Sequence, residues 1–203
     1  MEVPRTNFDD ALKFLFPGAI FLVCIYIFDS TILSAAPLEK VGLVVGACLL
    51  GGVVLFSVYR TILYDYAILS LLDWINEKRG NLNYRLWIRQ RYDVQASESE
   101  VLYAAVRTLY PELNTPTIRQ RSALIHFMYQ ASIIFLAFFL FSCFQPSRAL
   151  TFTYLAAGLI MGTSAILADI RLERQVFMIL NRAPNKVDRT ATKIGIHRRK
   201  NCK

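Results

Sequence analysis

Residues 41–59 read VGLVVGACLLGGVVLFSVY, a run of apolar and small residues that contains no charged side chain. A helix needs about 20 such residues to cross the hydrocarbon core of a membrane, whereas apolar runs of about 14 are typical of helices buried in soluble proteins. A surface helix of a soluble bundle also presents charged residues on its outer face every few positions. The stretch therefore predicts a transmembrane helix.

Three further runs of comparable length occur along the chain: Phe14–Ala36, Leu124–Phe144 and Ala149–Ala168. Only the first contains an acidic residue, Asp29, which lies near its far end. The whole chain is 55% hydrophobic and 19% charged, whereas about 45–50% apolar residues are usual in a soluble domain. We expect an all-α integral membrane protein with four transmembrane helices.

The first of these runs is predicted to be a retained span. Its apolar stretch is longer than that of a cleaved signal peptide, and Asp9 and Asp10 precede it where a signal peptide carries positive charge. The connections around Pro37 and Pro146 are short. The four spans should therefore form two hairpins of antiparallel neighbours.

Lysine and arginine are unevenly distributed. Segment 60–121 holds nine of them and segment 169–203 holds ten, whereas the connections 29–40 and 145–148 hold one each. Cytoplasmic loops of membrane proteins carry an excess of these residues. We therefore expect a multi-pass protein of a bacterial inner membrane, with both termini and the polar segment between the hairpins in the cytoplasm.

This pattern divides the chain into four segments. We expect a first transmembrane hairpin in residues 1–59, a cytoplasmic helical insert in 60–123, a second hairpin with a cytoplasmic helix extension in 124–182, and a flexible basic tail in 183–203. The helices should extend from the membrane into a small cytoplasmic helical cap. The tail lacks helical periodicity, and its positive charge suits membrane lipid first, an acidic partner second and nucleic acid last.

Helix signals set the expected boundaries within the polar segments. The second span should continue as one helix to about Arg79, because glycine follows at position 80. Residues 84–92 alternate between apolar and basic over a short stretch, so a short helix and a strand both fit. The helix of the third span should begin at Pro116, and that of the fourth should run to about Arg182.

Small residues recur in two of the predicted spans, at Gly42, Gly46 and Gly51 and again at Gly158 and Gly162. Helices in lipid associate mainly through close packing of such residues. We expect these glycines to make the tight helix contacts, within one chain or between chains. A homo-oligomer is expected, as for many small four-span proteins.

The sequence contains few groups suited to catalysis. Arg121 and His126 have the spacing Arg-x-x-x-x-His, which resembles the active-site motif of the helical RNases called HEPN, but a lone interfacial histidine is the simpler interpretation. No glycine-rich phosphate loop, nucleophile elbow or catalytic Cys/His pair occurs. No two of the four cysteines have metal-ligand spacing. We predict a protein that is not an enzyme, with no cofactor, metal or disulfide.

The polar residues within the predicted spans bear on whether the protein transports ions or forms a pore. No acidic residue, lysine or histidine lies near the middle of a predicted span, which argues against proton-coupled transport. The fourth span carries Thr153 and Thr163 among its hydroxyl residues. These leave a pore-forming or membrane-perturbing effector as the alternative function, although such hydroxyls usually bond to their own helix.

Aromatic and basic residues alternate near the middle of the insert. This pattern suits the core of a cytoplasmic cap, and it equally suits an exposed protein-binding patch, where arginine and tryptophan are enriched. The predicted partner-binding residues, in the insert and the tail, are Arg85, Trp87, Arg89, Arg91, Arg198, Arg199 and Lys200.

The layout resembles small four-span membrane proteins of bacterial antiviral systems, in particular the membrane subunit of the Kiwa system. The points of similarity are Phe16-Pro17-Gly18 opening the first span, the two tight hairpins, the basic insert around 85–92 and the basic tail. The resemblance covers architecture alone and carries over no functional residue. It implies a non-enzymatic inner-membrane scaffold or sensor that oligomerises and recruits a cytosolic effector in antiviral defence.

Overall fold

The computed structural model describes residues 8–28, 41–78, 84–92, 115–144, 148–182 and 184–193, together with the single positions 102, 105, 110, 113 and 196. The regular structure among these residues is entirely helical, so the predicted all-α class is confirmed for them. Two compact units are distinguished. We call Met1–Ile68 with Gln120–Ala168 the apolar unit, and Leu69–Arg119 with Asp169–Lys203 the polar unit.

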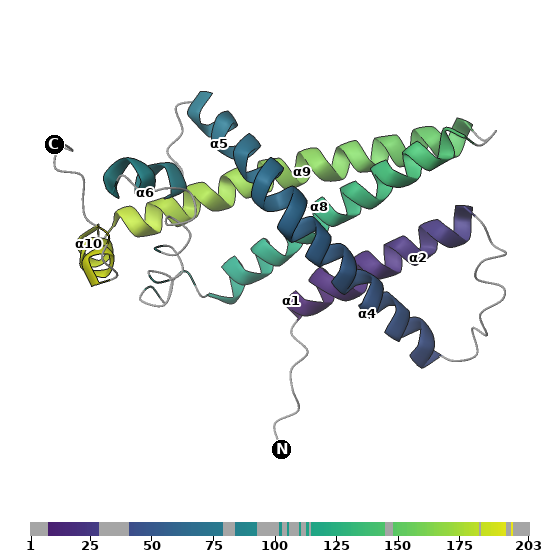
Figure 1. Ribbon diagram of the computed structural model, residues 1–203, viewed down its shortest axis with the longest axis horizontal. Helices are drawn as coiled ribbons and strands as arrows, with labels where there is room; N and C mark the ends of the chain where they lie inside the picture. The colour runs from purple at the N-terminus through teal and green to yellow at the C-terminus, as the bar shows by residue number, and fades with distance from the viewer. Residues whose placement is uncertain are drawn as a thin grey trace, which may run out of the picture. The chain divides into compact units, whose positions relative to one another are not determined.

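The helices follow one another along the chain in the order shown in Figure 1. Two stretches, η1 and η2, are wound as wider π-helices with i→i+5 hydrogen bonds. The described helices are α1 Phe8–Asp10, η1 Ala11–Leu15, α2 Phe16–Phe28, α4 Val41–Val58, η2 Tyr59–Ile68, α5 Leu69–Lys78, α6 Tyr84–Tyr92, α8 Pro116–Ser142, α9 Arg148–Asn181 and α10 Pro184–Lys193.

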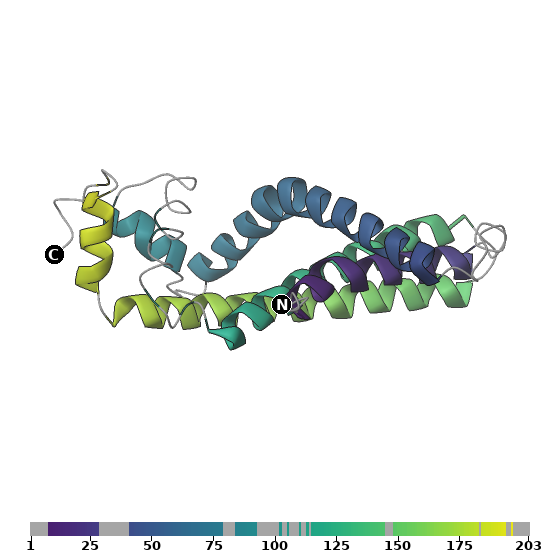
Figure 2. The ribbon, with the colours of Figure 1, turned by 90° about the horizontal axis from the view of Figure 1, so that it is seen from below.

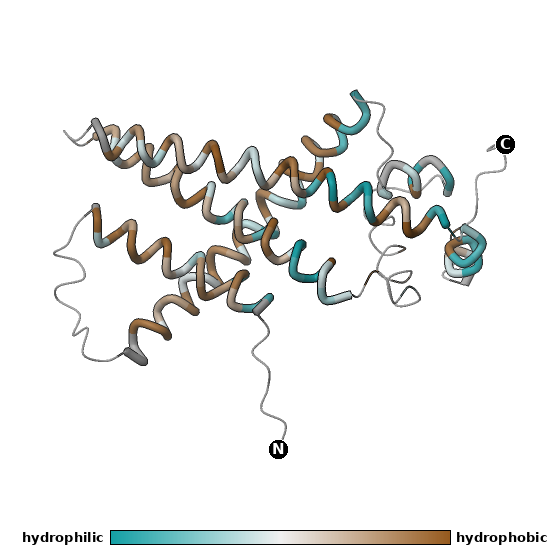
Figure 3. Tube along the Cα trace, turned by 180° about the vertical axis from the view of Figure 1, so that it is seen from behind, coloured by the Kyte–Doolittle hydropathy of each residue, from teal (hydrophilic) through white to brown (hydrophobic). Residues whose placement is uncertain are grey.

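Among the described residues, three helices are long and apolar enough to cross a membrane. They cover Val44–Lys78, Pro116–Ser142 and Leu150–Asn181, and they correspond to the second, third and fourth predicted spans. The helix Ala11–Ile27 is apolar but shorter, and positions 29–36 of the predicted first span lie outside the described residues. Figure 3 shows the apolar character of these helices in brown and the polar character of much of α10 in teal.

The predicted helix boundaries hold at three places. The helix of the second span continues through η2 and α5 to Lys78, and α9 extends to Asn181. The helix α8 begins at Pro116, and the Thr115 Oγ1 accepts a hydrogen bond from the Ile118 amide at 3.4 Å. Proline at the first helical position costs no hydrogen bond, because the first amides of a helix have no partner within it.

For two segments of the polar unit, the structure either decides between two predicted alternatives or differs from the prediction. Residues 84–92 form the helix α6, which buries Tyr84, Ile88 and Tyr92 at a spacing of four. The expectation of a tail without regular structure is wrong for Pro184–Lys193, which form α10. Its apolar face is only Val187 and Ala191, a spacing of four that is hard to recognise among polar neighbours.

Aromatic and aliphatic side chains from three helices pack together in the apolar unit. Cys24 of α2, Ile134 and Phe138 of α8 and Tyr154 of α9 form a buried cluster. The helices α8 and α9 lie side by side in both Figures 1 and 2, and the Ser132 Oγ donates a hydrogen bond to the Gly158 carbonyl at 2.8 Å. The small side chains at this crossing allow the two helices to approach closely.

The glycines divide into packed and open positions. A side chain at Gly18 would collide with the backbone of Cys48, and one at Gly52 with the backbone of Phe14, so these two glycines allow α2 with η1 to contact α4. Nothing lies within 4 Å of a β-carbon at Gly46 or Gly51. Within the chain, the close contact of α4 falls on the face that contains Gly52.

Gly158 and Gly162 of the fourth predicted span lie at close contacts within the chain. A β-carbon at Gly158 would lie 2.9 Å from the Leu136 Cδ2, and one at Gly162 would lie 2.8 Å from the Ser132 Oγ. Both contacts are with the third predicted span. Gly42 lies in α4, but its surroundings are outside what the structure describes.

Candidate partner-binding site

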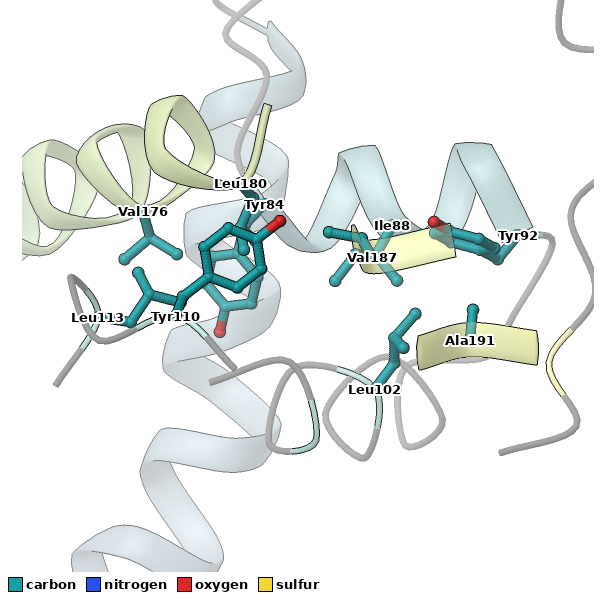
Figure 4. Close-up of a cluster of buried hydrophobic side chains, with 10 residues drawn as sticks. All are labelled: Tyr84, Ile88, Tyr92, Leu102, Tyr110, Leu113, Val176, Leu180, Val187 and Ala191. Carbon is teal, nitrogen blue, oxygen red and sulfur yellow. The ribbon is translucent and has the colours of Figure 1, made fainter. Parts of the chain in front are cut away.

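The core of the polar unit is built by short segments that are distant in sequence. Apolar side chains of α6, α9 and α10, with Leu102, Tyr110 and Leu113 between them, point toward one another in Figure 4. Leu102, Leu113, Leu180 and Val187 are completely buried. Burial of a leucine or valine contributes about 1.5–3 kcal/mol relative to exposure, so α10 is a structural part of this unit.

Asp188 of α10 is bound by two side chains of α6. The Arg91 Nε donates to the Asp188 Oδ1 at 3.0 Å, and the second guanidinium nitrogen donates to Oδ2 at 2.8 Å. The Tyr92 hydroxyl donates to the same Oδ1 at 2.6 Å. Such a two-pronged, charge-assisted contact fixes the orientation of both side chains. We call Arg91, Tyr92 and Asp188 the α6–α10 clamp.

In the clamp, the pKa values of Arg91 and Tyr92 are both raised, so both groups keep the protons that they donate to Asp188. The hydrogen bond to Asp188 raises the pKa of Arg91 above its ordinary value. Burial, and then the hydrogen bond to Asp188, raise the pKa of the Tyr92 hydroxyl. Tyr92 therefore keeps the proton that it donates to Asp188. The Arg91 guanidinium also lies 5.3 Å from the centre of the Trp87 ring, where a cation–π contact stabilises it further.

Two more polar contacts connect the helices of this unit. Arg89 of α6 pairs with Asp73 of α5, and both side chains are partly buried. The Asn76 Nδ2 donates to the Glu173 Oε2 at 3.0 Å, and both of these residues are almost fully buried, at 2% and 4% exposure. A buried carboxylate is costly unless it receives hydrogen bonds, so Asn76 helps Glu173 to occupy the interior.

The structure describes the side chains of only three of the seven predicted partner-binding residues. Arg89 and Arg91 are engaged in ion pairs within the chain, and Trp87 packs against the core beside Phe177, 6.2 Å between ring centres. The Arg85 side chain and the tail residues lie outside the described residues. For Arg89, Arg91 and Trp87 the structure gives a role in holding the polar unit together; the predicted role in partner binding is tested for none of the seven.

Sequence reasoning missed the residues that pair with these arginines. Asp188, Asn76 and Glu173 were not singled out for any role in the polar unit, whereas Asp73 was expected on a solvated charged face or in a pair with Arg60, Lys78 or a tail arginine. The signal that was available is Asp188 itself, the only acidic residue after Glu173 in a strongly basic segment. Such an isolated acid is a natural partner for an arginine elsewhere in the chain.

A second polar cluster lies within the apolar unit, around His126. The Tyr59 hydroxyl and the His126 Nδ1 are 2.7 Å apart. The rings of Tyr64, Tyr59 and Phe56 meet the imidazole edge-on, with centres 4.8, 5.8 and 6.2 Å away. The π-helical winding of η2 places Tyr59 and Tyr64, five positions apart, on this one cluster. His126 is thus an integral part of an aromatic cluster.

The side chains of Arg121 and His126 do not point toward each other. Five positions in an α-helix separate two side chains by about 140° around the axis, and α8 is α-helical throughout this stretch. Arg121 is exposed, whereas His126 is partly buried against the aromatic rings. The two groups of one chain therefore do not form a shared catalytic site, although the motif suggested one.

Other candidate chemistry is limited in the described part of the chain. No group of three or more His, Cys, Asp or Glu side chains there is arranged to hold a metal ion. The Thr163 hydroxyl donates to the Leu159 carbonyl at 2.7 Å, one turn earlier in its own helix, as expected for a threonine in an apolar helix. A fully apolar cavity of about 300 Å³ lies among α2, α4 and α8, next to Ile25, Leu55 and Phe138.

Comparison with protein-family models, curated proteins and solved structures finds no match to this chain. The case for function therefore depends on the residues and their arrangement.

Proposed function

We propose that the protein is a non-enzymatic membrane scaffold or sensor, which recruits a cytosolic effector protein through its polar unit. Its supporting observation is that the polar unit has its own buried core, closed by ion pairs and connected to helices long enough to cross a membrane. A rigid polar surface carried on apolar helices is suited to holding a soluble partner at a membrane.

The proposal includes four spans, with Phe14–Ala36 as the first. Both termini and the polar unit would face the cytoplasm of a bacterial inner membrane, because segments 60–121 and 169–203 carry most of the lysine and arginine. We propose that the chain assembles as a homo-oligomer. A role in antiviral defence follows from the resemblance to the membrane subunit of the Kiwa system.

The experiment is purification of the tagged full-length protein from its native host in mild detergent, followed by mass spectrometry and mass determination of the intact complex. A truncation that removes residues 197–203 tests the basic tail, including Arg198, Arg199 and Lys200. It retains Ile196, which packs against the core and donates its amide to the Ala191 carbonyl at 2.9 Å. A truncation of 201–203 alone is the matched control.

A stoichiometric soluble protein that is lost with residues 197–203 and kept in the control would support recruitment through the tail. A partner that stays bound to both truncations would move the binding surface to the folded polar unit. A homo-oligomer without any soluble partner would count against the scaffold function, and ion flux through liposomes carrying the purified chain would then test the pore.

A further inference from the structure

The part of α9 in the polar unit has two different faces. Asp169, Glu173, Val176 and Leu180 are buried, and their spacing of three or four residues places them on one face. The exposed residues Arg171, Arg174 and Met178 repeat at the same spacing on another face, and the exposed Arg182 follows directly after Asn181, the last residue of α9. We call this second set the α9 stripe. Met178 is 50% exposed.

The arginines of the α9 stripe differ from those of α6. Arg89 and Arg91 each bind a carboxylate of the polar unit. Within the described ranges, the side chains of Arg171, Arg174 and Arg182 have neither a hydrogen bond nor an ion pair. The fold therefore leaves three guanidinium groups, each with five donors in a fixed fork, without a partner along α9 and directly after it.

Lipid headgroups account for only part of the stripe. An α-helix rises about 1.5 Å per residue, so Arg171 follows the uncharged run 149–168 by about 5 Å and Arg182 by about 20 Å. The headgroup region is about 5–8 Å thick, and attraction to surface charge fades over about 8 Å at physiological salt. Anionic lipid explains Arg171 and Arg174, but it does not reach Arg182 or explain the exposed Met178.

We propose that the α9 stripe binds an acidic helix of a partner protein. Three carboxylates along about 16 Å of that helix would pair with the three arginines, and an apolar side chain between them would cover Met178. Charge complementarity selects the acidic partner, because the stripe contains three cations and no anion. Arginine is enriched at the centres of protein interfaces, and methionine adapts its shape to an apolar neighbour. This inference rests on the proposed scaffold function and names the chemistry of its partner.

The test places a photoreactive benzoylphenylalanine at position 178 of the full-length chain in the native host. The same residue at position 77 is the control, because that position is also exposed in the polar unit but does not belong to the α9 stripe. The proposal expects a protein adduct at position 178 and not at 77, with the cross-link in an acidic segment of the partner. Adducts with lipid alone at position 178 would overturn it.

A charge-matched pair of variants follows. The triple variant Arg171→Gln, Arg174→Gln, Arg182→Gln removes the stripe cations, and the control Lys78→Gln, Lys186→Gln, Arg189→Gln removes three exposed cations elsewhere in the polar unit. The synthetic peptide of the cross-linked segment is titrated against each full-length protein in phosphatidylcholine nanodiscs. We expect binding to the stripe variant to weaken roughly tenfold or more, and binding to the control to change less than about twofold.

The outcomes separate this inference from the proposed function. If the partner copurifies but its peptide binds the stripe variant as well as the unchanged protein, the scaffold function stands and the stripe inference fails. If no soluble partner copurifies, both fail. If adding phosphatidylglycerol to the nanodiscs abolishes peptide binding to the unchanged protein, the stripe is a lipid site, and the inference is again overturned.

Discussion

The apolar unit and the polar unit are held together by different means. In the apolar unit, glycines bring backbones into contact and aromatic rings fill the remaining space, as at Gly52 and Phe138. In the polar unit, an apolar core is enclosed by carboxylates bound to arginine, tyrosine and asparagine. In lipid, moving apolar surface from the solvent to a neighbouring helix gains little, so shape complementarity matters most. In water, burial drives folding, and the ion pairs mainly determine which helices pair.

The largest effect should come from the backbone contact of the apolar unit. Gly52→Val places a side chain against the Phe14 backbone, which cannot move aside as a side chain can, so α4 must separate from η1. We expect a loss of about 3 kcal/mol, at the upper end for overpacking, seen as a lower thermal unfolding midpoint in detergent. Gly46→Val is the control, because its side chain meets open space. Equal stability of the two variants would contradict the contact.

The next effect should come from the α6–α10 clamp. Asp188→Ala leaves Arg91 and Tyr92 without their shared acceptor, and we expect a cost of about 2 kcal/mol to the polar unit. Limited proteolysis should then cut α10 first. The exchange Arg91→Asp with Asp188→Arg should recover part of the stability lost in either single variant. Resistance of Asp188→Ala to proteolysis at the level of the unchanged protein would argue against the clamp.

The contribution of Tyr92 in the clamp to the free energy of unfolding should depend on pH. The pKa of the Tyr92 hydroxyl is raised in the folded protein, so its stabilising contribution is complete below the ordinary tyrosine value of about 10. It is lost as the pH rises toward the folded value. Unfolding by denaturant at pH 9 and pH 11 should show a fall in stability that is smaller in Tyr92→Phe. The same fall in both proteins would exclude this contribution.

The smallest effect should be at the crossing of α8 and α9. The β-carbon added by Gly158→Ala lies 2.9 Å from the end of the Leu136 side chain, which can change its rotamer. We expect a cost of about 1 kcal/mol, measured by thermal unfolding in detergent. Combining it with Leu136→Ala should relieve the crowding, so the two changes together should cost less than their sum. Strict additivity would show that the two residues are not in contact.

The sequence predicted well what depends on neighbours along the chain. Run length and composition located three apolar helices, and the Thr115-Pro116 signal located the start of α8. The same local signals failed where the apolar face is short. Val187 and Ala191 make α10 amphipathic, but two residues among lysines and threonines are too few for a recognisable period.

Contacts between distant residues were harder to predict. Arg91 and Asp188 are 97 positions apart, and nothing at either position alone identifies the other. Within the chain, close contacts lie at Gly158 and Gly162, which glycine spacing had singled out, and at Gly52, which it had not. Which side of a helix meets its neighbour depends on the rotation of the whole helix, and an almost uniformly apolar helix carries no signal for that rotation.

The position of α10 has a consequence for biosynthesis. Along the chain, the first residues of the polar unit's core are those of α6, and the last are Val187, Ala191 and Ile196. During translation, the apolar side chains of α6 and of Leu102, Tyr110 and Leu113 stay exposed until these residues have been made. A nonsense codon at any of positions 182–186 would therefore leave a chain with every long apolar helix intact and the apolar core of the polar unit uncovered. Such a product is a natural substrate for chaperones and proteases.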